Sequence, residues 1–491
     1  MMVKNKLYLS VNITVILLIA FCCFVMPMSV QAADGSCTVG VLDEDGGMTD
    51  TQAYDEPEQA WNAACTLARS GKNACMVLGK NWEHDSFYEA VSGGSVTVDL
   101  NGYAIIRNRN GKQTKNGYIF HIGKGARLII NDSDPDSEGY DGISGGVITG
   151  GANTNGAGAI QVEAGGELTI NAGTIYKCTT SEHGGAILLN GDSKAKAKLS
   201  MNGGRIYFCQ TVDAWTNCHG GAVYADRGEV LINNSKIDSC YSEDNGGAVY
   251  LNDGDFTIKN SLIIGNHCGD HGGGIYVGGG RMNVVNTRFS SNEAKNGGGL
   301  YVDYSSQNDY TKIRKCIFYK NKANNEGGGI YVNDDRCHLL DTDITYNTAG
   351  GSGGGVYVDS RYDLNIKGLM RVYSNQGKND QDNITLQSGT VTTAYLYSGG
   401  LYEGSRVGIG STGKNVKLGE GISTYQLERY YFADSGSLSS GDTSRQETPF
   451  YASAFGDGSL LVIGISGVII LVSVIAMVVV RLRKRKEESG E

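Results

Sequence analysis

The hexapeptide Gly246-Gly247-Ala248-Val249-Tyr250-Leu251 recurs 26 residues later as Gly272-Gly273-Gly274-Ile275-Tyr276-Val277. The motif begins with two Gly residues and a small residue. An aliphatic residue follows at the fourth position, Tyr in most copies at the fifth, and another apolar residue at the sixth. Because a unit of this length cannot bury its own apolar face, successive copies must stack on one another. Further copies centre on Ile187, Val223, Leu300, Ile330 and Val356, and a weaker copy centres on Ile160.

A second pattern keeps the same period and identifies the elements of each unit. Two apolar residues two positions apart are followed five positions later by a third, as in Phe256, Ile258 and Ile263. Short period-two runs separated by Gly, Asn, Asp and Ser are typical of strands, and no helical period lies between them. The sequence therefore predicts an all-β solenoid, a parallel β-helix with equivalent residues of successive coils about 4.8 Å apart. A leucine-rich repeat or a propeller fits this spacing less well.

A third column lies three positions after the last apolar residue of each unit. Stacked Asn side chains in such a column can satisfy the backbone groups of turns and one another. The later units carry Asn266, Asn292, Asn321, Asn347 and Asn375, and the earlier units carry Cys178, Cys209 and Cys240.

The paired Gly-Gly-(Ala/Gly)-aliphatic and Phe-x-x-Asn motifs resemble the repeats of chlamydial polymorphic outer membrane proteins. More broadly, the chain resembles right-handed parallel β-helix surface proteins of the pectin lyase-like class. The resemblance covers about 155–376, with weaker coils at 96–102 and 384–386. The C-terminus differs, because the chlamydial proteins end in an outer-membrane barrel. The C-terminus of this chain is similar to that of a Gram-positive surface protein, although a Leu-Pro-x-Thr-Gly signal is absent.

Both ends of the chain have the composition of targeting segments. Residues 1–32 place Lys4 and Lys6 before an apolar stretch and small residues before Ala33, as in a secretory signal peptide. Residues 459–480, from Ser459 to Val480, carry no charge and would form a helix of about 33 Å, enough to cross a bilayer. The basic tail at 481–491 predicts a cytoplasmic C-terminus and an extracellular N-terminal part. We therefore expect a single-pass protein of the cell membrane of a Gram-positive bacterium.

Between these ends we predict three segments. An N-terminal cap and first coil occupy 33–95, the β-helix occupies 96–433, and a flexible Ser/Gly-rich stalk occupies 434–458. Within 56–71 an amphipathic helix would cover the open first coil. Its apolar face comprises Ala60, Trp61, Ala64, Leu67 and Ala68.

Composition excludes several classes of protein. Of 491 residues, 72 are Gly and 4 are Pro, without the Gly at every third position that collagen requires. The formal net charge of −10 argues against nucleic-acid binding and against capture of anionic polymers by bulk attraction. No cofactor is expected, and the absence of a Cys-x-x-Cys motif argues against a zinc site.

The Tyr of the repeated hexapeptide provides the first candidate site. These residues alternate with inward aliphatic neighbours and should point outward from one sheet, as a stripe about 24 Å long. The stripe could bind sugar rings or a partner peptide, or it could be a self-stacking ladder that stabilises the sheet, which we favour. The candidate ligand-binding residues are Tyr224, Tyr250, Tyr276, Tyr301, Tyr331 and Tyr357.

Cysteine residues are candidates for disulfide bonds. Cys178, Cys209 and Cys240 share one column, where neighbours lie at a distance that a disulfide can bridge. Cys65 and Cys75 could tie the cap to the first coil. The thiols in the column could equally be buried and reduced.

Histidines and acidic residues provide weaker candidates for metal sites. His183, His219 and His271 each precede a Gly pair, and turn capping explains them better than metal binding. The acidic run 132–141 is interpreted as a solvated loop, because Ser137 stands where an EF-hand has its central Gly.

Three functions fit these observations. The first is a membrane-anchored, surface-displayed, non-catalytic adhesin-like protein that binds glycans or surface proteins of other cells. The second is a carbohydrate-active enzyme, a polysaccharide lyase or glycoside hydrolase of the pectin lyase-like class. The pair Asp334-Asp335 is interpreted as a turn, and no catalytic residue is assigned. The third is a passive spacer.

Overall fold

The structure is a computed structural model that describes residues 35–453 with internal gaps. The gaps are 91–92, 108–111, 213–216, 304–309, 334–336, 360–361, 363, 379, 389–395, 413–415, 421, 436 and 441–449. The predicted signal peptide, membrane span and basic tail, and the pair Asp334-Asp335, lie outside the described residues. No helix within the described ranges combines the length and the apolar character needed to cross a membrane.

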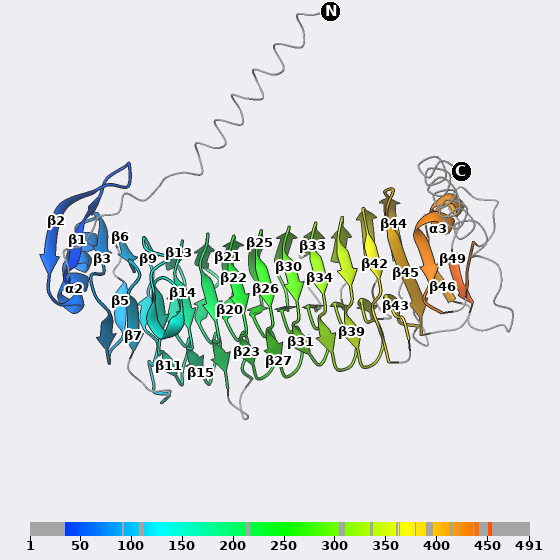
Figure 1. Cartoon of the computed structure of the whole chain (residues 1–491), viewed down its shortest axis with the longest axis horizontal. Helices are drawn as coiled ribbons and strands as arrows, with labels where there is room; N and C mark the ends of the chain where they lie inside the picture. Colours follow the sequence, from blue (N-terminus) through cyan, green and yellow to red (C-terminus); the bar gives the residue numbers. More distant parts are fainter. Residues whose placement is uncertain are drawn as a thin grey trace, which may run out of the picture.

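The chain winds into a solenoid of about 11 turns, whose strands pair in register with those of neighbouring coils. Figure 1 shows the coils stacked along one axis, with the N-terminal elements at one end and the C-terminal elements at the other. A typical coil runs through β20 (Val223–Asp226), β21 (Gly228–Asn233), β22 (Lys236–Asp238) and β23 (Tyr241–Ser242) before the next Gly pair begins β24 (Val249–Leu251). The prediction of a parallel β-helix is confirmed.

The strands of each coil lie in four parallel stacks, which we call sheets A, B, C and D; sheets B and C join near the C-terminal end into one 24-stranded sheet. Sheet A contains β1 (Cys37–Leu42), β2 (Met48–Tyr54), β3 (Asn73–Val77), β6 (Ser95–Asp99), β9 (Arg127–Asn131), β13 (Glu167–Ile170), β17 (Ala197–Met201), β21, β25 (Gly254–Lys259), β29 (Arg281–Val285), β33 (Tyr310–Arg314), β37 (Cys337–Leu340), β41 (Leu364–Gly368), β44 (Leu396–Leu401), β46 (Val416–Glu420), β48 (Ser437–Ser440) and β49 (Phe450–Ser453).

Sheet B follows sheet A in each coil. It contains β4 (Trp82–His84), β7 (Ala104–Arg107), β10 (Val147–Thr149), β14 (Thr174–Tyr176), β18 (Arg205–Tyr207), β22, β26 (Leu262–Ile264), β30 (Arg288–Ser290), β34 (Ile317–Tyr319), β38 (Asp343–Thr345), β42 (Arg371–Tyr373), β45 (Arg406–Ser411) and β47 (Tyr431–Ala433).

Sheet C carries the repeated hexapeptide, and sheet D is a short sheet at the turn before it. Sheet C contains β5 (Tyr88–Ala90), β8 (Phe120–Ile122), β12 (Ile160–Glu163), β16 (Ile187–Asn190), β20, β24, β28 (Ile275–Val277), β32 (Leu300–Val302), β36 (Ile330–Val332), β40 (Val356–Val358) and β43 (Ile384–Leu386). Sheet D contains β11 (Ala152–Asn153), β15 (Thr179–Thr180), β19 (Gln210–Thr211), β23, β27 (His267–Cys268), β31 (Glu293–Ala294), β35 (Lys322–Ala323) and β39 (Thr348–Ala349).

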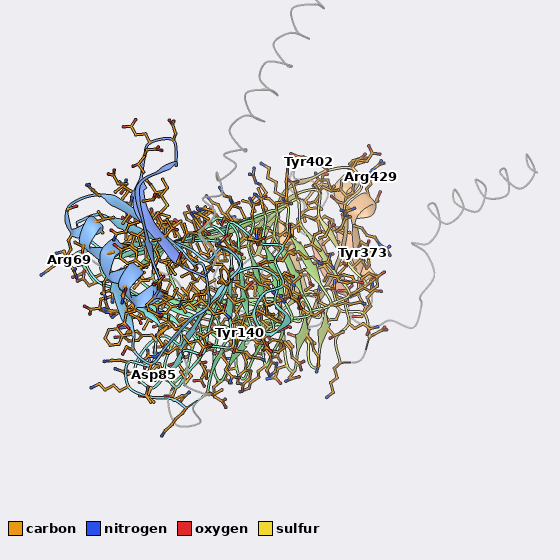
Figure 2. The ribbon with its side chains drawn as sticks, turned by 60° about the vertical axis from the view of Figure 1, so that its left-hand side comes forward. Arg69, Asp85, Tyr140, Tyr373, Tyr402 and Arg429 are labelled. Carbon is orange, nitrogen blue, oxygen red and sulfur yellow. The ribbon has the colours of Figure 1, made fainter. Side chains whose placement is uncertain are left out.

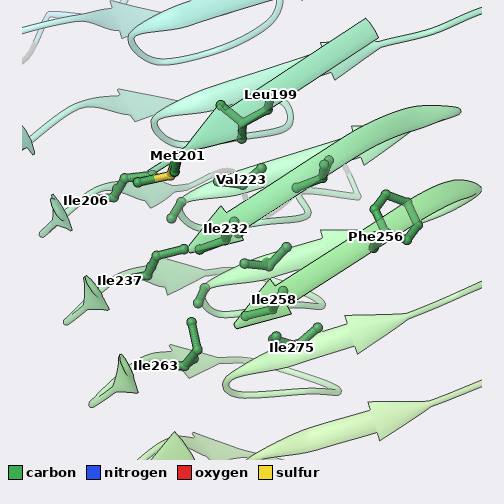
Figure 3. Packing of buried hydrophobic residues seen from close by; sticks show 14 of the residues in the cluster. Leu199, Met201, Ile206, Val223, Ile232, Ile237, Phe256, Ile258, Ile263 and Ile275 are labelled. Carbon is green, nitrogen blue, oxygen red and sulfur yellow. The ribbon is translucent and has the colours of Figure 1, made fainter. Parts of the chain in front are cut away.

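The apolar residues of the period-two runs fill the interior. Val230 and Ile232 of β21 lie in register with Phe256 and Ile258 of β25, and all four are buried. Figure 3 shows equivalent residues of successive coils stacked in columns inside the solenoid. Because side chains alternate between the two faces of a strand, every residue between two buried ones points outward.

The two Gly residues of the hexapeptide have different physical roles. Gly246 adopts φ 72°, a left-handed conformation that L side chains rarely adopt. At Gly247 a Cβ atom would lie only 2.3 Å from the carbonyl oxygen of Gly273 in the next coil. The first Gly therefore permits the corner, and the second permits neighbouring coils to approach.

A helix packs at the N-terminal end of the solenoid. α2 (Pro57–Arg69) contacts β1, β3 and β6 and buries Ala60, Trp61, Ala64, Cys65 and Ala68. The Trp61 ring lies 5.5 Å from that of Phe120, centroid to centroid, inside the early coils. β1 pairs antiparallel with both β2 and β3, which adds a hairpin to this end of sheet A.

The C-terminal end differs from the predicted flexible stalk at 434–458. β48 and β49 lie within this stretch and form an antiparallel pair, and β49 also pairs with β46. These strands satisfy part of the open backbone edge of the last coil, which the Ser/Gly-rich composition alone does not reveal. α3 (Thr424–Tyr430) precedes them, and a 3-10 turn (Tyr140–Gly142) lies in the loop before β10.

Candidate functional site

The Tyr residues of sheet C form a continuous stack. Centroids of neighbouring rings are 4.6–5.3 Å apart, and from Tyr224 to Tyr301 the ring planes differ by only 7–8°. Tyr276, Tyr301 and Tyr357 are 8%, 8% and 6% exposed, and the other members are half-buried. Each ring therefore covers the face of its neighbour, and the stack offers mainly edges and hydroxyl groups to a ligand. This geometry favours a stabilising ladder over open sugar-binding faces.

The histidines before the Gly pairs extend this aromatic stack. The His183 ring lies 4.3 Å from that of Tyr224 and 5.3 Å from that of His219, and the His219 ring lies 4.5 Å from that of Tyr250. His183 Nδ1 accepts the backbone N–H of His219, and His219 Nδ1 accepts that of Asn245. Burial lowers the pKa of both His183 and His219 to about 4. The two imidazoles are therefore neutral turn caps, as the sequence indicated.

Carboxylates and amides border the other side of the Tyr stack. The Asn252 amide donates to Asp226, and the Asn333 amide donates to Asp303 across 2.8 Å. The Tyr276 hydroxyl donates to Asp303. Burial and this contact raise the pKa of Tyr276 far above its usual range. These side chains therefore form hydrogen bonds between neighbouring coils on the outer surface of sheet C.

The predicted Asn column is a buried ladder. In each rung from Asn266 to Asn375, the backbone N–H and the Nδ2 group donate to Oδ1 of the next member at 2.9–3.1 Å. The ladder continues to Asn383, only eight residues after Asn375, and ends on the carboxylate of Asp434. Burial raises the pKa of Asp434 to about 7. The fixed spacing of the repeat could not reveal these last two members.

The cysteines of the same column take over the role of the Asn side chains. The Cys209 thiol faces the carbonyl oxygen of Ile175, and the Cys240 thiol faces that of Ile206, one coil earlier in each case. All ten Cys residues of the described part are buried, and none of them forms a disulfide bond. The structure therefore contains none of the disulfide pairings considered from the sequence. Cys65 belongs to the core beneath α2, whereas Cys75 alternates with the inward residues Ala74 and Met76.

The acidic run 132–141 is not uniformly solvated. Asp132 is buried, and its carboxylate accepts the backbone N–H groups of Gly102 and Gly146. The expectation of a solvated loop was therefore wrong for Asp132, because these two amides replace its water. Asp141 remains outside and pairs with Lys177 across 2.7 Å. No group of three or more His, Cys, Asp or Glu in the described ranges is arranged to hold a metal ion.

Sheet A carries ion pairs across its outer face, around a shallow hollow of about 440 Å³. Asp255 pairs with Lys196 and Arg281, and Lys198 lies between Glu167 and Glu229. Burial raises the pKa of Asp255, but its bonds to the two cations outweigh burial and leave the pKa lowered. These charges therefore join neighbouring coils.

Sheet B carries a surface that the sequence reasoning missed. Its outward positions bring cations onto aromatic rings, with the Arg205 guanidinium 3.6 Å from the Tyr207 centroid and that of Arg288 5.0 Å from the Tyr319 centroid. The signal was present, since these residues flank the buried Ile and Phe of the Phe-x-x-Asn strand. The apolar repeat that predicts the fold involves only the inward positions of that strand.

A family model described as a right-handed β-helix region matches residues 186–369. No curated protein and no solved structure matches the chain. The narrower resemblance to polymorphic outer membrane proteins and to the pectin lyase-like class stays a prediction. Together with the register of the sheets, the matched model supports the assignment of this chain as a parallel β-helix.

Proposed function

We propose that this chain is a non-catalytic, adhesin-like β-helix that is anchored in the membrane and displayed at the cell surface. The pattern of the two ends supports this topology, with a signal at 1–32, a span at 459–480 and a basic tail. In this arrangement α2 covers the first coil at the end of the solenoid farthest from the membrane, as terminal caps of solenoids do.

The observation that carries the proposal is the coupling of outward polar groups between coils. Tyr rings stack on Tyr rings in sheet C, and carboxylates bind cations in sheet A. Side chains used in this way hold the rod together and leave broad lateral surfaces. A rod with such surfaces suits contact with glycans or proteins of other cells. The Tyr column remains a candidate contact surface through its edges and hydroxyl groups.

The alternative of a carbohydrate-active enzyme finds its best support in sheet A. Glu229 and Asp255 are register partners in neighbouring coils, and both line the hollow of sheet A. Two carboxyl groups on one surface are what a glycosidase requires. A glycosidase also needs one carboxyl group with a raised pKa to protonate the leaving group. The pKa of Asp255 is instead lowered, so this pair lacks an acid on the Asp255 side.

Binding and hydrolysis can be separated with the full chain reconstituted in nanodiscs. We would apply it to a glycan array and incubate it with the same polysaccharides, with Asp255→Asn as the matched variant. Binding without released products is the expected result. Product release that is abolished by Asp255→Asn would establish that the protein is an enzyme. The absence of both binding and product release would favour a passive spacer.

Display is tested separately on intact cells. An added protease should cleave the solenoid while the basic tail remains protected. Protection of the solenoid until the cells are lysed would contradict the proposed location.

A further inference from the structure

We propose that the outer face of sheet B is a docking surface for an acidic polypeptide that also bears apolar side chains. This inference rests on the proposed binding role and names the surface and the chemistry of the partner. The surface, called here the sheet B patch, is formed by Phe208, Leu262, Arg288, Ile317, Lys320 and Tyr346.

The sheet B patch concentrates apolar side chains that the fold does not bury. Phe208, Leu262, Ile317 and Tyr346 are 48%, 40%, 37% and 52% exposed, and they are four of the seven exposed large apolar residues of the described part. They occur on strands β18 to β38 or in the turns directly after them. Five coil steps separate the first from the last, a length of about 24 Å.

Two of these residues occupy a backbone position that disfavours large side chains. Phe208 and Tyr346 have φ of 53° and 58°, in the left-handed region. The equivalent turns of other coils have the same positive φ without an aromatic ring; they carry Lys177, Ser239, Gly265, Ser291, Lys320 and Ser374. The solenoid therefore does not need aromatic rings at this corner, and their exposure there points to a role outside the fold.

The charge of the face is opposite to that of the chain. Arg288, Lys320 and Arg406 pair with no carboxylate of the described residues. The carboxylates on this face are Asp141, Asp238 and Asp343, and each already binds a neighbouring cation. Within a chain of net charge −10, this is a locally basic surface that suits an acidic partner. The net charge of the whole chain argues only against capture of anionic polymers by bulk attraction. The cations of the face are Lys177, Arg205, Lys236, Arg288, Lys320, Arg371 and Arg406.

The arrangement of the rings favours a polypeptide over a sugar chain. Arg205 covers the face of Tyr207, Arg288 and Lys320 lie over Tyr319, and Arg406 lies over Tyr373, which Figure 2 labels. Sugar rings would need those faces open. Exposed Leu and Ile beside Arg and aromatic residues instead match the composition of protein interfaces, in which Arg and aromatic side chains are enriched.

The test measures binding of a short synthetic peptide in which Glu alternates with Leu, using the full chain in nanodiscs of zwitterionic lipid. Fluorescence anisotropy should show binding that weakens with salt. Leu262→Ser with Ile317→Ser should weaken it about tenfold, and so should Arg288→Glu with Lys320→Glu. The matched control, Leu231→Ser with Lys312→Glu on the outer face of sheet A, should leave it unchanged.

Two outcomes would overturn the proposal. The first is absence of peptide binding by a wild-type chain whose circular dichroism shows a folded solenoid. The second is binding of dextran sulfate and the peptide alike, with no effect of the Ser substitutions, because that would be general polyanion attraction. Peptide binding by a chain that proves to be absent from the cell surface would leave the sheet B patch standing and contradict the display role.

Discussion

Single residues at the turns of this solenoid form hydrogen bonds with the neighbouring coils. Asn321 accepts from Asn292 and donates to Asn347, while its Nδ2 also donates to the carbonyl of Phe289. Asp434 can end this series because its two carboxyl oxygens accept from the backbone N–H and the Nδ2 group of Asn383. The identity of each such residue is therefore fixed by its place in the stack.

Replacement of a central rung should be costly. Asn321→Ala would leave the buried donors of Asn292 without an acceptor, and we expect a loss of about 3 kcal/mol in the free energy of unfolding. Denaturant titration measures this loss. The control is Asn202→Ala, at the end of an exposed row formed by Asn131, Asn171 and Asn202, where a change within about 0.5 kcal/mol is expected. Equal effects of the two variants would contradict a special role for the buried ladder.

The histidines predict a specific dependence on pH. The folded-state pKa of His183 and of His219, about 4, lies below the usual 6.5, so the unfolded chain binds protons first as the pH falls. Their contribution is complete above pH 6.5 and is lost between pH 6.5 and 4, by at most about 3 kcal/mol for each. Asp244 and Asp270 face the two rings and reduce the effect.

Variants isolate this histidine effect. Asp434 acts in the opposite sense, because its raised pKa makes its contribution decline as the pH rises from about 4 towards 7. We would therefore compare wild type with His183→Asn/His219→Asn, which copies the Asn that stands at position 245. The double variant should lose less stability than wild type between pH 6.5 and 4. Parallel stability curves would refute the assignment of neutral, buried imidazoles.

The absence of disulfide bonds among the described cysteines predicts how many thiols can be alkylated. Since all ten described Cys residues are unbonded, alkylation of the unfolded chain without reductant should modify each of them. Peptide mass spectrometry identifies the modified positions. Protection of Cys178 with Cys209, or of Cys65 with Cys75, would instead establish the disulfides considered from the sequence.

At the scale of the element, the Tyr stack of sheet C acts as a single unit. Rings about 5 Å apart gain both burial and aromatic contact with two neighbours. Removing adjacent members should therefore cost more than removing exposed rings. Beside the stack, Asp303 accepts a hydrogen bond from the hydroxyl group of Tyr276.

Tyr250→Ser with Tyr276→Ser tests the stack. We expect a loss of about 2–4 kcal/mol from lost burial and ring contacts, measured by denaturant unfolding. Tyr402→Ser, at a ring that is 59% exposed, is the control and should have little effect. Loss of glycan or protein binding in a Tyr250/Tyr276 variant that keeps its stability would favour the ligand platform instead.

At the scale of the whole molecule, additional elements pack or pair at each end of the solenoid. Trp61 of α2 packs on Trp82 and Phe120 of the first coils, while β48 and β49 pair at the other end. We expect Trp61→Ala to cost about 3–5 kcal/mol and to promote self-association by uncovering the first coil. Unfolding experiments and light scattering measure these two effects. Gln59→Ala, on the exposed side of α2, should change neither.

Much of the fold could be predicted because the repeat is local. The inward columns and the Asn ladder follow from residues a fixed distance apart, and each coil repeats the same solution. The ladder beyond Asn375 could not be predicted, because Asn383 and Asp434 break the spacing. The sheet B patch also escaped prediction, since its members differ in type from coil to coil and only the register brings them together.

The amino-acid sequence by itself determined that the chain forms a parallel β-helix, because the repeat length and the period-two apolar runs permit burial only by coil-on-coil stacking. The tertiary structure alone decided which faces of the outward rings stay open. The Tyr rings of the stack belong to different coils, as do the Arg288–Tyr319 and Arg406–Tyr373 contacts, and their geometry depends on the register between coils. That register covers the Tyr faces of sheet C and leaves Phe208, Leu262, Ile317 and Tyr346 exposed on sheet B.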